Sequence, residues 1–167
     1  MTILNYRTRC ISFLLLIILG IGLSVRGSAQ NTPPSSCDTK MVGLLTASGH
    51  TFTTHKDNVW SIVFDRDSLK NFKVIISTDS KDLVVIFVIV AQNAQMNHTP
   101  EFMQALLRAN HDFDYVKVGF DNDGDLFVRT DTTCRLLDVD ELKAMITQVA
   151  SSANDLHKSV KGWISPK

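Results

Sequence analysis

Residues 83–91 read Leu-Val-Val-Ile-Phe-Val-Ile-Val-Ala, nine apolar residues in succession and rich in valine and isoleucine. A run of this length and composition is typical of a strand that is covered on both faces, so we place it at the centre of a sheet. Residues 59–65 and 72–77 precede it with the alternating pattern of two further strands. Short polar segments separate the three, which predicts antiparallel neighbours joined by tight turns.

Helical and hairpin patterns surround these strands. Residues 38–48 and 99–110 carry apolar side chains at helical spacing behind polar N-cap residues. Residues 115–129 predict a hairpin, because two alternating segments flank an acidic turn that contains Asp-Gly. Residues 138–160 predict a long closing helix. The order helix, three strands, helix, two strands, helix predicts an α+β domain with a mainly antiparallel sheet and its helices on one face.

The first 29 residues have the three parts of a secretory signal peptide. Arg7 and Arg9 precede an apolar segment over 11–25, and small residues follow at Gly27 and Ala29. This apolar segment is shorter than the roughly 20 residues that cross a bilayer, which favours cleavage after Ala29 over an uncleaved anchor. We therefore expect an exported protein, periplasmic or secreted, with no stable membrane anchor after cleavage. Residues 30–37 then form a flexible lead, and residues 38–164 form a single domain.

The charge balance argues against several classes of partner. The 167 residues include 17 basic and 17 acidic side chains, and 44% of the residues are hydrophobic. Loss of the three arginines of the signal peptide leaves 14 basic and 17 acidic residues, a net charge of −3. A mildly acidic globular domain has no electrostatic reason to bind nucleic acid or an anionic membrane. The composition also excludes disordered and collagen-like chains.

Two cysteines, Cys37 and Cys134, remain after cleavage. An oxidising compartment permits a disulfide between them, and this pairing is our prediction. It would close a loop of about 97 residues, for which chain entropy gives a stabilisation of about 4–5 kcal/mol. The alternative is two separate thiols, one of them buried.

Candidate catalytic and metal sites are weak. Asp121, Asp123 and Asp125 alternate as at the start of a calcium-binding loop, but Leu126 and Thr132 stand where that loop needs glycine and glutamate. A tight turn explains the same residues. The five histidines show no zinc-ligand spacing. We expect no catalytic residue, no metal and no cofactor. A hydrolase centred on His111 and Asp114 is a lesser hypothesis.

The second face of the predicted sheet carries the more informative pattern. A sheet with helices on one side should present polar residues on the other, but apolar residues alternate there instead: Val63, Ile75, Val85, Phe87, Ile89 and Phe127. Contiguous exposed apolar surface usually marks an interface. The alternative is intrachain cover by a helix, for which the N-terminal helix is a candidate. We take Val85, Phe87, Ile89 and Phe127 as the partner-binding residues.

Two motifs resemble those of the YbjN-like domain family. The helix Phe-Met-Gln-Ala-Leu-Leu-Arg-Ala-Asn at 102–110 is similar to that family's leucine-rich helix ending in asparagine. The segment Lys-Val-Gly-Phe-Asp-Asn-Asp-Gly-Asp-Leu at 117–126 resembles its hairpin. The resemblance covers most of residues 38–160, the first half by element order alone. It implies the fold of type III secretion chaperones, which are small, often dimeric proteins that bind other proteins.

These observations together predict an exported, non-catalytic protein-binding domain, chaperone-like or regulatory. It would hold a protein partner, or a second copy of itself, on the apolar sheet face. The alternative prediction is a small-molecule or lipid carrier with a pocket between the sheet and the helices.

Overall fold

The computed structural model describes residues 35–79 and 82–165, so the predicted signal peptide and residues 30–34 of the lead lie outside the described residues. The described elements are α1 (Ser36–Ser48), β1 (Thr53–Lys56), β2 (Val59–Phe64), β3 (Phe72–Thr78), β4 (Leu83–Ala91), α2 (Pro100–Asp112), β5 (Lys117–Phe120), β6 (Leu126–Thr133) and α3 (Val139–Val160). Three short 3-10 helices complete the set: η1 (Asn93–Gln95), η2 (Cys134–Leu136) and η3 (Lys161–Trp163).

The strands form one six-stranded antiparallel sheet in the order β1-β2-β3-β4-β6-β5. The nine-residue apolar strand β4 lies inside the sheet between β3 and β6, as its sequence predicts. Its residues alternate strictly between buried and half-buried from Leu83 to Val90. Within the part of the chain that the structure describes, only one face of this strand is fully buried, so the prediction that both faces are covered is wrong there.

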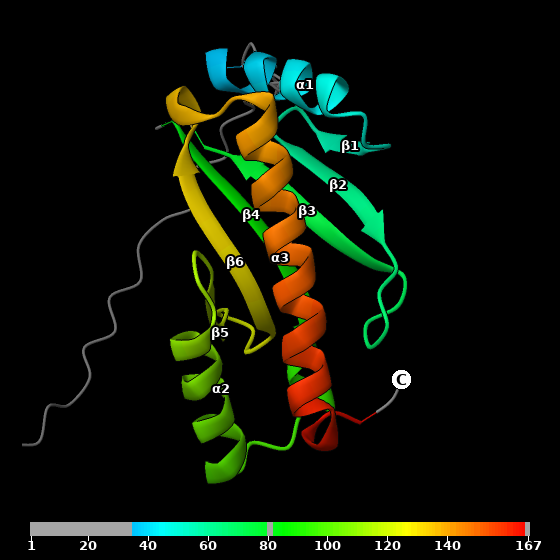
Figure 1. Ribbon diagram of the computed structural model, residues 1–167, viewed down its shortest axis with the longest axis vertical. Helices are drawn as coiled ribbons and strands as arrows, with labels where there is room; N and C mark the ends of the chain where they lie inside the picture. The colour runs from blue at the N-terminus through cyan, green and yellow to red at the C-terminus, as the bar shows by residue number, and fades with distance from the viewer. Residues whose placement is uncertain (1–34, 80–81, 166–167) are drawn as a thin grey trace, which may run out of the picture. The chain divides into compact units, whose positions relative to one another are not determined.

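One hydrophobic core joins the sheet to its helices. In Figure 1, α3 crosses in front of β3 and β4 and runs beside β6, while α2 lies beside β5 and α1 lies at the opposite end of the sheet. The side chains at the centre of this core are fully buried: Trp60, Val74, Ile76, Val84, Ile86, Val128, Leu142, Ile146, Val149 and Leu156. Full burial of one aliphatic side chain contributes about 1.5–3 kcal/mol, so the core between the sheet and its helices dominates the stability of the fold.

The first part of the chain differs from the prediction at the start of the first helix and in the number of strands. The first helix begins at Ser36, and Ser35 caps it by accepting a hydrogen bond from the Asp38 N–H while Asp38 accepts one from the Ser35 N–H. Ser36 and Cys37, which we expected in a flexible lead, are therefore helical. A fourth strand, β1, precedes the three that were predicted. The observed order is helix, four strands, helix, two strands, helix.

The closing helix follows its sequence signals more closely. Asp138 caps α3 by accepting a hydrogen bond from the Glu141 N–H at 2.8 Å, and the helix continues to Val160 as predicted. Within the described residues, no helix combines the length and the hydropathy that a membrane span requires.

Candidate functional site

The second face of the sheet, opposite α3, carries the predicted partner-binding residues side by side. Cross-strand pairing sets Ile75 against Phe87 and Ile89 against Phe127, with Val85 two residues along β4 from Phe87. These five side chains are half-buried, and Val63 on β2 is 54% exposed. The apolar side chains thus form a continuous patch over β3, β4 and β6, which we call the second face.

Intrachain cover of this face by the N-terminal helix was the alternative. The structure does not support it, because α1 packs against α3 and η2. Its buried residues Met41 and Leu45 belong to the same core as Trp60. All three α-helices of the described chain therefore contribute to the core on the α3 side, and Figure 1 shows none of them behind the sheet.

A charged cluster that the sequence did not predict borders the apolar patch. Asp131 on β6 forms an ion pair with Lys117 of β5 and a bidentate pair with Arg129, at 2.9 and 3.0 Å. Burial alone would raise the pKa of Asp131, but hydrogen bonds from Arg129 and Lys117 and their charges lower it below its usual value. The period-two alternation of β6 gives the only sequence signal for this cluster, because it puts Phe127, Arg129 and Asp131 on one face.

Phe127 joins the apolar patch to the edge strand β5. Its ring lies over Gly119, where a β-carbon would come within 3.1 Å of the ring. The Arg129 guanidinium carbon lies 5.8 Å from the centre of the same ring. Gly119 therefore leaves space for an aromatic side chain that ends the patch at the charged cluster.

The acidic segment between β5 and β6 is a turn held by its own carboxylates. Asp121 accepts hydrogen bonds from the N–H groups of Asp123 and Asp125, both at 2.9 Å. Gly124 adopts a positive φ of 81°, which glycine tolerates best. Asp125 in turn accepts a hydrogen bond from the Asn93 N–H at 2.8 Å. The geometry favours the turn interpretation over a calcium loop.

The histidines are dispersed over the described chain. His55 contacts the Ser61 hydroxyl, His98 contacts the Asn93 side chain, and His157 contacts the Ser68 hydroxyl, at 2.8 to 2.9 Å. His111 and Asp114, the residues of the hydrolase hypothesis, are both exposed at the end of α2 and just beyond it. Among the described residues, neither side chain has a hydrogen-bond or ion-pair partner, whereas a nucleophilic site needs a base held beside its nucleophile.

Cys37 and Cys134 lie together as a disulfide pair, with their Cα atoms 5.9 Å apart. This distance falls within the range that a disulfide requires. The pair joins α1 to η2, and the Lys40 ammonium adds a hydrogen bond to the Cys134 carbonyl at 2.7 Å. Asp82 brings a carboxylate within 4.8 Å of both sulfurs, but paired sulfurs supply no thiolate for a metal.

The family model described as "Putative bacterial sensory transduction regulator", named YbjN, matches residues 41–161. The chain belongs to the YbjN family. No curated relative matches its sequence. The family membership confirms the resemblance seen in the helix at 102–110 and in the following hairpin.

Solved structures share the fold of this YbjN-family chain at low identity. YbjN of E. coli, described as "a putative transcription regulator", is similar at 12% identity and a TM-score of 0.56, covering 77% of this chain and 95% of that one. The Yersinia pestis type III secretion chaperone SycH, in complex with a fragment of YscM2, is 14% identical with a TM-score of 0.53, and the match covers 72% of this chain and 99% of that one. The ExoU–SpcU heterodimer of Pseudomonas aeruginosa is 14% identical with a TM-score of 0.53, and the match covers 75% of this chain and 98% of that one. The predicted chaperone-like α+β fold is thereby confirmed.

Proposed function

We propose that this protein is an exported, non-catalytic protein-binding domain, chaperone-like or regulatory, that receives a protein partner or a second copy on its second face. The observation that carries the proposal is the continuous apolar patch over β3, β4 and β6, which no described helix covers. Contiguous apolar surface of this kind marks interaction sites on soluble domains, because its burial against a partner removes it from water.

The structural neighbours support a protein-binding role. SycH was solved with a fragment of YscM2, and another neighbour is the HopA1–SchA chaperone–effector complex, which covers 78% of this chain at a TM-score of 0.50. The signal-peptide pattern of residues 1–29 and the Cys37–Cys134 pair support export, since disulfides persist in oxidising compartments.

The second face is tested by comparing Phe87→Asp with a control variant, Leu136→Asp. Phe87 lies at the centre of the patch, whereas Leu136 is an apolar side chain on η2 with 62% exposure. The full chain is expressed with its signal sequence. The exported protein is then examined by light scattering after gel filtration and by affinity capture.

We expect Phe87→Asp to abolish self-association or the stoichiometric partner of the wild type, and Leu136→Asp to leave both unchanged. Circular dichroism verifies that both variants are folded. A folded Phe87→Asp protein with the wild-type oligomeric state and partner would refute a role for this face. A small molecule retained by the wild type in native mass spectrometry, with no protein bound, would favour the carrier hypothesis instead.

A further inference from the structure

The ladder between β3 and β4 stops halfway along both strands. These strands pair from Thr78 with Val84 to Ile75 with Phe87, and no further. Their outer ladders continue, however, because β2 pairs with β3 as far as Phe72 and β4 pairs with β6 beyond Ile89. The sheet is therefore split between residues 72–74 of β3 and 88–91 of β4, and we call this gap the β3–β4 cleft.

Backbone groups of Lys73 and Ile89 point into this cleft. In an antiparallel ladder, the N–H and C=O groups of alternate residues point to the same side of a strand. The Asp79 N–H donates to the Leu83 carbonyl at 3.0 Å. The backbone N–H and C=O groups of the odd-numbered residues of β3 and β4 therefore point toward the other of these two strands. The Thr78 N–H donates to the Asn58 carbonyl at 3.1 Å, which agrees with this assignment because even-numbered residues of β3 then point toward β2. Lys73 and Ile89 would be the next such pair if the ladder continued.

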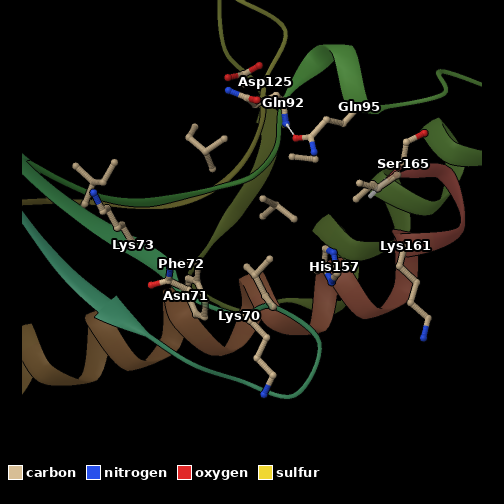
Figure 2. Close-up of a pocket in the computed structure, with 16 residues that line it drawn as sticks. Lys70, Asn71, Phe72, Lys73, Gln92, Gln95, Asp125, His157, Lys161 and Ser165 are labelled. Atoms are coloured by element: carbon tan, nitrogen blue, oxygen red, sulfur yellow. Dashed lines mark hydrogen bonds between the residues drawn. The ribbon is translucent and has the colours of Figure 1, made fainter. Parts of the chain in front are cut away.

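An open cavity of about 770 Å³ occupies the same place. Apolar side chains from both sides of the split line it, among them Phe72, Ile75, Ile89 and Ile164. Figure 2 shows Gln92, Gln95 and Asp125 across the cavity from Lys70, with His157 between Phe72 and Lys161. The cavity therefore combines open strand edges with apolar walls.

The charge around the cleft is mostly positive. Lys70, Lys73 and Lys161 line it, against the single carboxylate of Asp125, which already accepts the Asn93 N–H. His157 adds no positive charge of its own, because burial and the charge of Lys161 lower its pKa and favour the neutral imidazole. Because the net charge of the predicted mature chain is −3, this positive concentration runs against the overall balance. An anionic occupant is complementary to it.

We propose that the β3–β4 cleft binds an extended, acidic peptide segment of a protein partner. Such a segment would pair with the backbone of Lys73 and Ile89 and would place alternate side chains on the apolar walls, as in strand addition to an open sheet edge. Strand edges with their donors and acceptors directed into a cavity favour a peptide over a lipid, whose chain offers no such groups. The inference rests on the proposed function and specifies the class of partner segment.

The chain's own lead is a poor occupant. Residues 30–34 read Gln-Asn-Thr-Pro-Pro, which carries no acidic side chain and has two prolines that cannot donate to a ladder. A segment from another polypeptide fits the cleft better on both counts.

The test uses a blocked heptapeptide of alternating glutamate and valine, with a lysine–valine peptide of the same length as its control. Amide hydrogen exchange and chemical shifts of the exported protein are followed by NMR. In the free protein we expect the amides of Lys73 and Ile89 to exchange at least tenfold faster than those of Ile75 and Phe87. We expect the acidic peptide to slow both amides at least tenfold and the basic peptide to leave them unchanged.

A charge variant separates the cleft from the rest of the surface. Lys70→Gln with Lys73→Gln should weaken binding of the acidic peptide about tenfold, whereas Lys56→Gln with Lys143→Gln removes the same charge from exposed positions elsewhere and should not.

The inference is overturned if Lys73 and Ile89 are protected in the free protein as strongly as Ile75 and Phe87, because the ladder would then be closed. It also fails if the acidic peptide does not bind, or binds both double variants equally. If the acidic peptide does not bind while Phe87→Asp still disrupts assembly, the proposed function of the second face is retained and only the cleft proposal is refuted. If both fail, the proposed function fails with it.

Discussion

Asn110 completes the outer edge of the sheet from a helix. Its side-chain oxygen accepts a hydrogen bond from the Val118 N–H at 2.8 Å, and its side-chain nitrogen donates to the Val118 carbonyl at 2.9 Å. Both backbone groups belong to the edge strand β5 and point away from β6. An asparagine amide is the side chain that offers a donor and an acceptor in this arrangement. This gives Asn110 a structural role in the last turn of α2, which continues to Asp112 rather than ending at Asn110 as the sequence predicts. The two hydrogen bonds also protect an edge that would otherwise invite another strand.

Replacing this amide should cost stability. Asn110→Ala removes the two hydrogen bonds to Val118, of about 0.5–1.5 kcal/mol each, and a longer one to the Leu106 carbonyl at 3.4 Å. The better helix propensity of alanine partly offsets this, for a net loss of about 1 kcal/mol. Urea unfolding followed by circular dichroism measures it. Gln104→Ala, at an exposed position of the same helix, is the control and should change stability by less than about 0.5 kcal/mol. Equal stability of the two variants would show that the Val118 contacts contribute nothing.

Asp38 predicts a pH dependence with a defined sign. Burial alone would raise the pKa of its carboxyl, but hydrogen bonds from the Thr78 hydroxyl and from the N–H and hydroxyl of Ser35 lower the pKa below its usual value. A lowered folded-state pKa stabilises the fold above the unfolded-state pKa of about 4, and this contribution is lost as pH falls through the folded-state pKa.

Asp38→Asn should therefore destabilise the fold by roughly 2 kcal/mol at pH 7. The difference from the wild type should shrink steadily below about pH 4. Guanidinium unfolding at a series of pH values measures this, with the exposed Asp67→Asn as the control. A difference that stays constant from pH 7 to pH 2 would contradict a role for the ionised carboxylate.

At the scale of elements, the helices and strands that can be predicted are those whose own sequence shows a periodic pattern of apolar residues. The strands β2, β3 and β4 and the helices α2 and α3 carry alternation or helical spacing, and their positions follow from it. The strand β1 reads Thr-Thr-His-Lys and is exposed along its whole length, so only its pairing with β2 makes it a strand. The capping box of Ser35 and Asp38 was present in the sequence, but the prolines before it favoured a flexible lead.

The candidate site also has a part that the sequence predicts and a part that it does not. The alternation of β4 and β6 predicts which residues share the second face, because side-chain period alone decides it. The β3–β4 cleft could not be predicted, since residues 72–78 and 83–91 both continue as apolar strands past the point where their pairing ends. Register and splay depend on contacts between distant elements, such as the packing of the 65–71 loop on Asn154 of α3.

The Cys37–Cys134 link ties α1 to the end of β6 through η2. We predict that the purified protein contains it and that its removal by Cys37→Ser with Cys134→Ser lowers the free energy of unfolding by about 4–5 kcal/mol. Thiol labelling under denaturing conditions, with and without a reductant, reports the redox state, and urea unfolding reports the stability. Reduction of the wild type should reproduce the stability of the double variant. Two thiols that label without reductant would contradict the link.

At the scale of the whole molecule, the two faces of the sheet differ in how they are covered. Among the described residues, the face toward α3 is fully buried, whereas the second face is only half-buried, so a partner seated there would complete its burial. A domain with one complete core and one incomplete layer can fold alone and still gain stability from association. Successive residues of β4 therefore lie alternately on the fully buried face and on the half-buried second face.

Val84 and Val85 provide the matched pair. Val84 is fully buried against α3, so Val84→Ala should cost roughly 2–3 kcal/mol at any protein concentration. Val85 faces the second face, so Val85→Ala should cost less than about 1 kcal/mol in the dilute monomer. If a second copy covers this face, the cost of Val85→Ala should rise with protein concentration while that of Val84→Ala stays constant. Thermal unfolding over a hundredfold range of concentration measures both. A concentration-independent cost for Val85→Ala would exclude self-association through this face and leave a heterologous partner as its occupant.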